Sequence, residues 1–264
     1  MDGVEVRGDW IVWQPLSRWQ PVQLPQDFYL RELMDIAPDD LEAAASIMKN
    51  YGMLFEFDQE DIERDRRIEL SGSAMNPPDD DAAGAFHKDE VRLHIETAQY
   101  AIKTWISLQS PDSYEALQEL EADSLTDEAY EDYRRNNPHR DDSREEYEVF
   151  VLGARVSSFR EILNAALSLI SVGIVTGLPS EMQGIPGHHT VYSSSFLQLY
   201  NHMVEEATVR HCANEPCRRP FVRQRGRARF EQHRTEGIMY CSRECARAQA
   251  QRELRRRRRN EKAN

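Results

Sequence analysis

Four cysteines constrain this chain more than any other feature. They are the only cysteines among 264 residues, and they form two close pairs near the C-terminus, Cys212 with Cys217 and Cys241 with Cys245. Tetrahedral zinc is commonly held by four thiolates that two separate turns of a chain supply in close pairs. The spacing, C-x4-C followed after 23 residues by C-x3-C, therefore predicts a structural Zn²⁺ site made by these four side chains.

The cellular compartment decides between a metal site and disulfides. The N-terminal sequence MDGVEVRGDW lacks the basic-then-apolar order of a signal peptide, and no stretch approaches the roughly 20 apolar residues of a membrane span. We therefore expect a cytoplasmic protein without a membrane partner, in which thiols stay reduced. Free thiols in a small core are the alternative, which the scarcity of nearby apolar residues disfavours. His211 and His233 are weaker candidate ligands, because four thiolates already complete the shell.

The segments around the cysteines predict a compact finger. Asn214 and Pro216 lie between the first two cysteines and suit a tight turn, here called the knuckle. Ser242 is a suitable N-cap, and the residues after Cys245 are strong helix formers. A knuckle, a basic middle segment and a second cysteine pair that opens a helix are the parts of a treble-clef finger.

Charge divides the chain sharply. Residues 207–264 carry a net charge of +11 and residues 1–206 a net charge of −24, although the whole chain carries −13. This asymmetry predicts an acidic body joined to a module for an anionic partner. We divide the chain into an acidic, mostly helical body (1–206), a four-cysteine zinc finger (207–254) and a basic tail (255–264).

Arginine supplies nearly all of the positive charge at the C-terminus, with 16 arginines against one lysine in residues 207–264. A guanidinium group donates two parallel hydrogen bonds to a phosphate, so this preference favours nucleic acid over mere solubility. A charge run is also often only a solvated face, and Arg255–Arg259 are interpreted as a long-range attractant. The candidate nucleic-acid-binding residues are Arg218, Arg219, Arg223, Arg225, Arg227, Arg229, Arg243, Arg247 and Arg252.

The body is predicted to be mainly α-helical. Apolar residues recur at steps of three and four in segments 91–108, 148–172 and 193–212, which predicts three long helices, the last running directly into Cys212. Asp39 or Asp40 is expected to begin a shorter helix that Gly52 ends. Short strands are expected only within the first 25 residues and at MLFEF. The residues expected to face the core are Val91, Ile95, Ala98, Ile102, Trp105, Leu152, Val156, Phe159, Leu163, Ala166, Ile170, Phe196, Tyr200, Met203 and Ala207.

Two stretches, HCANEPCRRPF and YCSRECARAQAQRELRRRRR, resemble the CGNR-type zinc finger of bacterial transcription regulators. That family has a C-x4-C knuckle with a nearby phenylalanine, then an aromatic-Cys-Ser step and a second cysteine pair that leads into an arginine-rich helix. Its members commonly carry an N-terminal helical domain, often called ABATE, to which FYLRELMDIAPDDLEAAASIMKNYG is similar. The chain departs from the family where Cys245–Ala248 reads Cys-Ala-Arg-Ala, in a second pair one residue tighter, and in a longer segment between the pairs.

The charge division and the resemblance together imply a zinc-finger protein that binds nucleic acid and regulates transcription, with DNA the favoured partner and RNA a variant of the same hypothesis. The helical body is a candidate homodimerisation unit. The alternative is a zinc-stabilised protein-interaction module whose basic end docks on an acidic partner or on its own acidic body. An enzyme is not expected, because four thiolates leave no open metal position for catalysis, although His233 is the candidate general base of a nuclease.

Overall fold

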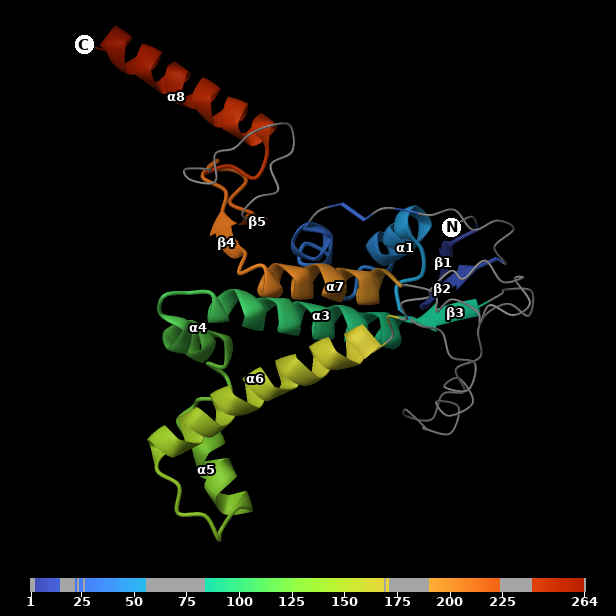
Figure 1. Cartoon of the computed structure of the whole chain (residues 1–264), viewed down its shortest axis with the longest axis vertical. Coiled ribbons are helices and arrows are strands. Elements are labelled where there is room, and N and C mark those ends of the chain that lie inside the picture. Colours follow the sequence, from blue (N-terminus) through green and yellow to red (C-terminus); the bar gives the residue numbers. More distant parts are fainter. Residues whose placement is uncertain are drawn as a thin grey trace.

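The computed structural model describes residues 3–14, 22, 24–25, 27–55, 84–168, 170, 190–223 and 239–263. This part of the chain is mainly helical, as the sequence predicted, and in it no helix has the length and apolar character needed to span a membrane. Figure 1 shows the order of the elements along the chain. The helices are η1 (Tyr29–Leu33, a π-helix), α1 (Leu41–Tyr51), α3 (Lys88–Leu108), α4 (Ser113–Leu120), α5 (Asp127–Asn136), α6 (Arg144–Ser168), α7 (Val191–Val204) and α8 (Arg243–Ala263).

The helix α3 forms the centre of the body: α6 packs against it, α7 packs against α6, and Tyr192 of α7 meets His94 of α3 (Figure 1). Every residue that the sequence placed on the core face of α3 is buried, which confirms that prediction. On α6 the predicted stripe is confirmed at Leu152, Phe159, Leu163 and Ala166. The helix α1 also begins and ends as expected: the Asp40 carboxylate accepts a hydrogen bond from the Ala43 amide, and Gly52 ends it with φ of 107°, a conformation that favours glycine.

The predicted core face of α7 is wrong in part. Phe196 is buried, but Tyr200 is 43% exposed, and the neighbouring Leu199 and His202 are buried instead. The helix also stops at Val204 rather than running into Cys212, because Glu206 takes a positive φ of 49° and the chain turns into a strand. This turn places the cysteine pairs beyond the end of the helix bundle.

A small antiparallel sheet lies at the N-terminal side of the body. It consists of β1 (Glu5–Arg7), β2 (Trp10–Trp13) and β3 (Gly84–His87), in that spatial order. Gly84 pairs with Trp13, and a Cβ atom at position 84 would collide with the indole ring, so glycine is required there. The expected strand at MLFEF is not formed by its described residues, 53–55; Met53 and Leu54 instead accept hydrogen bonds from the first amides of α7.

The strongly acidic region, residues 112–148, is here called the arm; it comprises α4, which packs against α3, and then α5 and the start of α6. The rings of Tyr130 and Tyr133 lie 5.3 and 4.9 Å from that of Tyr147, giving the arm a small aromatic core. Arg144 joins its parts by donating to the carbonyl oxygens of Leu125 and Thr126. In Figure 1 the arm and α8 leave the helix bundle near the same end but on opposite sides of it, the arm below and α8 above.

Candidate metal centre

The four cysteines that the sequence singled out meet at one point. Their sulfur atoms all lie within 4.8 Å of one another, and Cys217 Sγ and Cys245 Sγ are 3.6 and 3.5 Å from Cys241 Sγ. Four sulfurs held tetrahedrally at about 2.3 Å from one ion would be about 3.8 Å apart. A disulfide would need about 2.05 Å. The spacing therefore fits a metal site and not a pair of disulfides.

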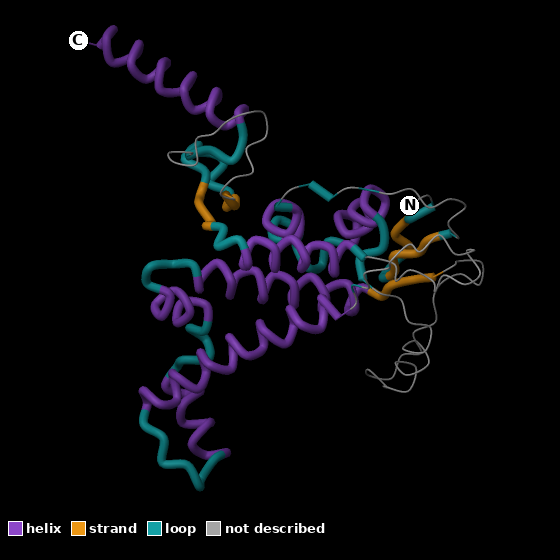
Figure 2. Tube along the Cα trace, viewed as in Figure 1, coloured by secondary structure: helices purple, strands orange, loops and turns teal. Residues whose placement is uncertain are grey.

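Two short strands and a turn position the first pair. The strands β4 (Thr208–His211) and β5 (Pro220–Arg223) pair antiparallel on either side of the knuckle, at the base of α8 (Figure 2). Within the knuckle the amides of Cys217 and Arg218 both donate to the Asn214 carbonyl, at 2.8 and 3.1 Å. The tight turn expected from Asn214 and Pro216 is thus present, and it directs Cys212 and Cys217 to the same side.

The second pair is placed by the start of α8. The Cys245 amide donates to Ser242 Oγ at 3.2 Å, which confirms the predicted N-cap. The two pairs are joined by a hydrogen bond from the Ala213 amide to the Met239 carbonyl at 2.7 Å. The Cys241 amide lies 3.5 Å from Cys212 Sγ, where an N–H group stabilises a thiolate.

The electrostatic environment of the four thiol groups favours a bound cation. Burial, followed by the neighbouring thiols, raises the pKa of Cys241 well above that of a free thiol. In contrast, a hydrogen bond from the Asn214 side chain lowers the pKa of Cys245 to about 7, although burial opposes it. Four thiolates this close repel one another, so all four lose their protons only around a positive ion. Asn214, which is 6% exposed, thus stabilises the thiolate of Cys245 as a hydrogen-bond donor and not as a ligand.

His211 is exposed on β4 and does not belong to the cluster, while the other proposed substitute ligand, His233, lies outside the described residues. The donor set within the described part of the chain is therefore sulfur alone. Such a set is typical of Zn²⁺ and of iron held by thiolates.

A polar network, which we call the Glu215 network, fastens α8 to the knuckle. Arg256 donates to both Glu215 carboxylate oxygens, at 2.7 and 2.5 Å, and Gln249 contacts the amide and the carboxylate of Glu215 at 3.4 Å. Arg252 donates to Gln249 Oε1 at 3.3 and 3.2 Å. Because Gln249 is only 5% exposed, this network fixes the direction in which α8 leaves the metal centre.

The candidate nucleic-acid-binding arginines do not form one surface. Arg243 and Arg247 are exposed on α8, and Arg218 is exposed on the knuckle with φ of 47°. Arg219 instead forms an ion pair with Asp35 of the body at 3.2 Å, and Arg252 belongs to the Glu215 network. The remaining candidates, for which no side-chain placement is described, are Arg223, Arg225, Arg227 and Arg229.

Sequence reasoning missed the contact between the finger and the body. Val209 and Val222, on β4 and β5, pack against the hydrophobic core of the body. The Arg31 guanidinium of η1 donates to the Cys241 carbonyl at 3.4 Å. Arg31 and Cys241 are about two hundred positions apart in the chain, so no local pattern signalled this junction.

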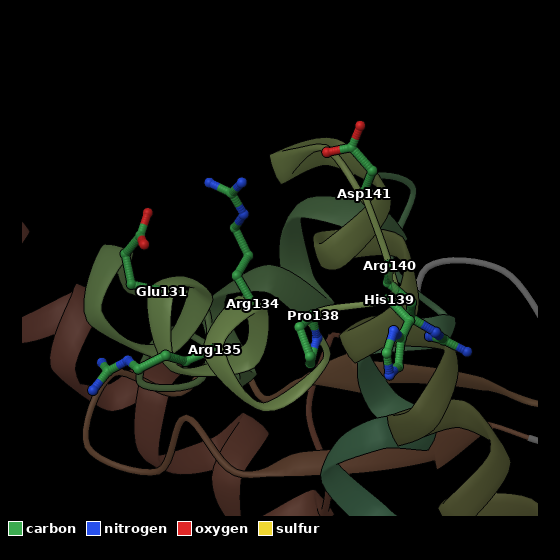
Figure 3. A pocket seen from close by; sticks show the side chains of 7 residues that line it. All are labelled: Glu131, Arg134, Arg135, Pro138, His139, Arg140 and Asp141. Carbon is green, nitrogen blue, oxygen red and sulfur yellow. The ribbon is translucent and has the colours of Figure 1, made fainter.

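Two other places in the body were candidates for a binding site. The depression at the end of α5 is lined by charged side chains that point away from one another (Figure 3), so they present no convergent set to a ligand. In the core, Tyr29 Oη lies 2.6 Å from His202 Nδ1, and His202 Nε2 lies 3.8 Å from Asp27. The void beside Tyr29 is too small for a water-sized molecule. Neither place therefore forms a binding site for a substrate.

No family model, curated protein or solved structure matches this chain. The resemblance to the CGNR-type finger therefore rests on the motif residues around Cys212–Cys217 and Cys241–Cys245 alone.

Proposed function

We propose that this protein is a zinc-finger protein that binds nucleic acid, and specifically a DNA-binding transcription regulator of the kind that the CGNR-type resemblance implies. The observation that carries the proposal is the joining of a four-sulfur site to a basic helix: Cys245 lies in the first turn of α8, and the Glu215 network fastens the same helix to the knuckle. An ion bound by the four sulfurs would therefore position α8.

Zinc is the proposed ion because four thiolates and no other described ligand surround the site, and a closed sulfur shell suits a structural Zn²⁺. A finger with so few apolar residues needs such support, since structural zinc contributes on the order of 10–16 kcal/mol in small finger peptides. The chain's own residues hold the ion: Cys212 and Cys217 from the knuckle, and Cys241 and Cys245 from the start of α8.

Charge supports nucleic acid as the partner. The residues from 207 onward carry +11, mostly as arginine, and α8 carries exposed arginines along much of its length. Nucleic acid binding by such a surface releases counterions, so affinity should fall steeply as salt rises. The acidic body, at −24, would be repelled by the same polyanion, which favours contact through the finger end alone.

The test measures zinc and binding on the same samples. Wild-type protein is expected to contain one zinc per chain by elemental analysis and to bind a short labelled DNA duplex in fluorescence anisotropy, with affinity falling about 10³-fold or more between about 50 and 200 mM salt. Cys241→Ser should lose both zinc and binding. A control, Ser194→Ala on α7, should retain both. If the zinc-loaded protein does not bind the duplex but binds an acidic peptide, the proposal is rejected and the protein-interaction alternative is favoured.

A further inference from the structure

The helix α8 has two faces with different tasks. One face carries Cys245, Gln249, Arg252 and Arg256, which recur at steps of four, three and four and so lie on one side of the helix. Cys245 belongs to the cysteine cluster, Gln249 and Arg256 contact Glu215 of the knuckle, and Arg252 donates to Gln249. We call this the inner face. Its two arginines are engaged with Glu215 and Gln249, so their charge serves to hold the helix.

The opposite side of α8 repeats the same spacing. Arg243, Arg247, Gln251, Leu254 and Arg258 follow at steps of four, four, three and four, and all five are exposed, Leu254 to 50%. We call this the outer face. It extends over 15 residue steps, or about 22 Å at 1.5 Å per residue. In Figure 1 α8 projects away from the body, so the bundle does not cover this length.

The composition of the outer face suits base recognition better than general attraction. Arginine pairs with two acceptors of guanine, glutamine pairs with adenine, and an apolar side chain contacts the methyl group of thymine. Arg255 and Arg257, which flank this face, are placed to reach phosphates on either side.

We propose that the outer face of α8 enters the major groove of duplex DNA, with Arg247, Gln251, Leu254 and Arg258 toward the base edges. The inference rests on the proposed function and adds the contact surface and the form of nucleic acid to it. The major groove of B-DNA, about 12 Å wide, admits a helix of about 10–12 Å diameter. The major groove of A-form RNA is too deep and narrow for side chains to read. Duplex DNA is thus the partner that this geometry accepts.

The Glu215 network links the metal centre to the helix that is proposed to bind DNA. The inner face is bound to the knuckle through Glu215, and the knuckle supplies Cys212 and Cys217. An ion held by the four sulfurs would therefore help to orient the outer face without touching the DNA. The sequence interpretation of Arg252 as a DNA-gripping residue is replaced by a positioning role.

Two double variants with equal loss of charge separate the faces. Arg247→Gln/Arg258→Gln changes the outer face, and Arg252→Gln/Arg256→Gln changes the inner face. For the outer pair we expect the slope of log affinity against log salt to become shallower by about 2, because two positive charges are lost from the surface that faces the DNA and fewer counterions are released. The inner pair should keep the wild-type slope and instead raise the rate of amide exchange in α8. Zinc content controls for folding of the finger in both.

Leu254→Ala tests base reading directly. The variant should keep the wild-type slope of log affinity against log salt. Among duplexes that differ from one another at a single base pair, its preference for one base pair over the others should fall by about fivefold or more at one position. An RNA duplex of the same length should bind at least about tenfold more weakly than DNA. Equal slopes for the inner and outer pairs, or equal affinity for the RNA duplex, would overturn the inference while leaving nucleic-acid binding intact. A wild-type protein that binds no nucleic acid would instead reject the proposed function itself.

Discussion

A half-buried histidine of α3, His94, makes the stability of the body depend on pH in a calculable way. The His94 ring stacks on Phe55, with centroids 3.9 Å apart and planes at 16°, and Tyr192 meets it edge-on at 5.6 Å. Burial among these rings lowers the pKa of His94 from 6.5 to about 4. The imidazole is therefore neutral in the folded protein at pH values where it is protonated in the unfolded chain.

The direction and size of the effect follow from this difference. As pH falls below 6.5 the unfolded chain gains a proton at His94 that the folded protein does not take up until about pH 4, so the free energy of unfolding decreases across this window and then levels off. One pKa unit corresponds to about 1.4 kcal/mol, so the whole window corresponds to about 3 kcal/mol. Tyr192 does not contribute, because burial raises its pKa to about 12.

Replacing His94 by phenylalanine isolates this contribution, since phenylalanine can stack on Phe55 but cannot titrate. Urea unfolding of both proteins, followed by circular dichroism at several pH values from neutral to about 4, gives the difference in their free energies of unfolding. The free energy of unfolding of the variant, taken relative to that of the wild type, should increase by about 3 kcal/mol from neutral pH to about pH 4. Carboxylates titrate in both proteins and cancel. A difference that stays constant with pH would refute the placement of His94 between the rings of Phe55 and Tyr192.

Two further predictions concern buried polar groups. Asn214→Ala should weaken metal binding by about 10- to 100-fold, because Cys245 loses its hydrogen-bond donor; competition with a chelator measures this loss. The control Asn136→Ala, which changes an exposed asparagine, should have no effect. Glu121→Ala should lower the free energy of unfolding by about 3 kcal/mol, because it leaves the Arg155 guanidinium, 6% exposed, without its carboxylate. Adding Arg155→Met to that variant should restore most of the loss; no recovery in urea unfolding would contradict this reading.

The sequence predicted those parts of the fold in which a local repeat matches a buried surface. The stripe on α3 from Val91 to Trp105 and most of that on α6 follow from a period of 3.6 residues. The face of α7 was harder because Phe196, Leu199, Tyr200 and Met203 are all large and apolar or aromatic, so two neighbouring stripes compete. Partners from elsewhere in the chain decide between them: Tyr29, 173 positions away, contacts His202.

The metal centre was predictable because ligand identity and spacing carry the chemistry. The four cysteines and the Ser242 cap needed no knowledge of the fold. The roles of Arg219 and Arg252 could not be read in the same way, since both look like any other arginine of a basic segment. Their partners, Asp35 and Gln249, become visible only when the body and the helix are placed in space.

The packing of β4 and β5 on the body bears on how the finger can be studied. Ala207 is 2% exposed, and Val209 and Val222 pack against the body core, so the boundary at residue 207 passes through a shared apolar surface. A fragment cut there would expose this surface to water and would lose the Arg31 contact to the Cys241 carbonyl. The excised finger would then be prone to self-association. Tests of metal and DNA binding therefore need the intact chain, because the body covers an apolar side of the finger.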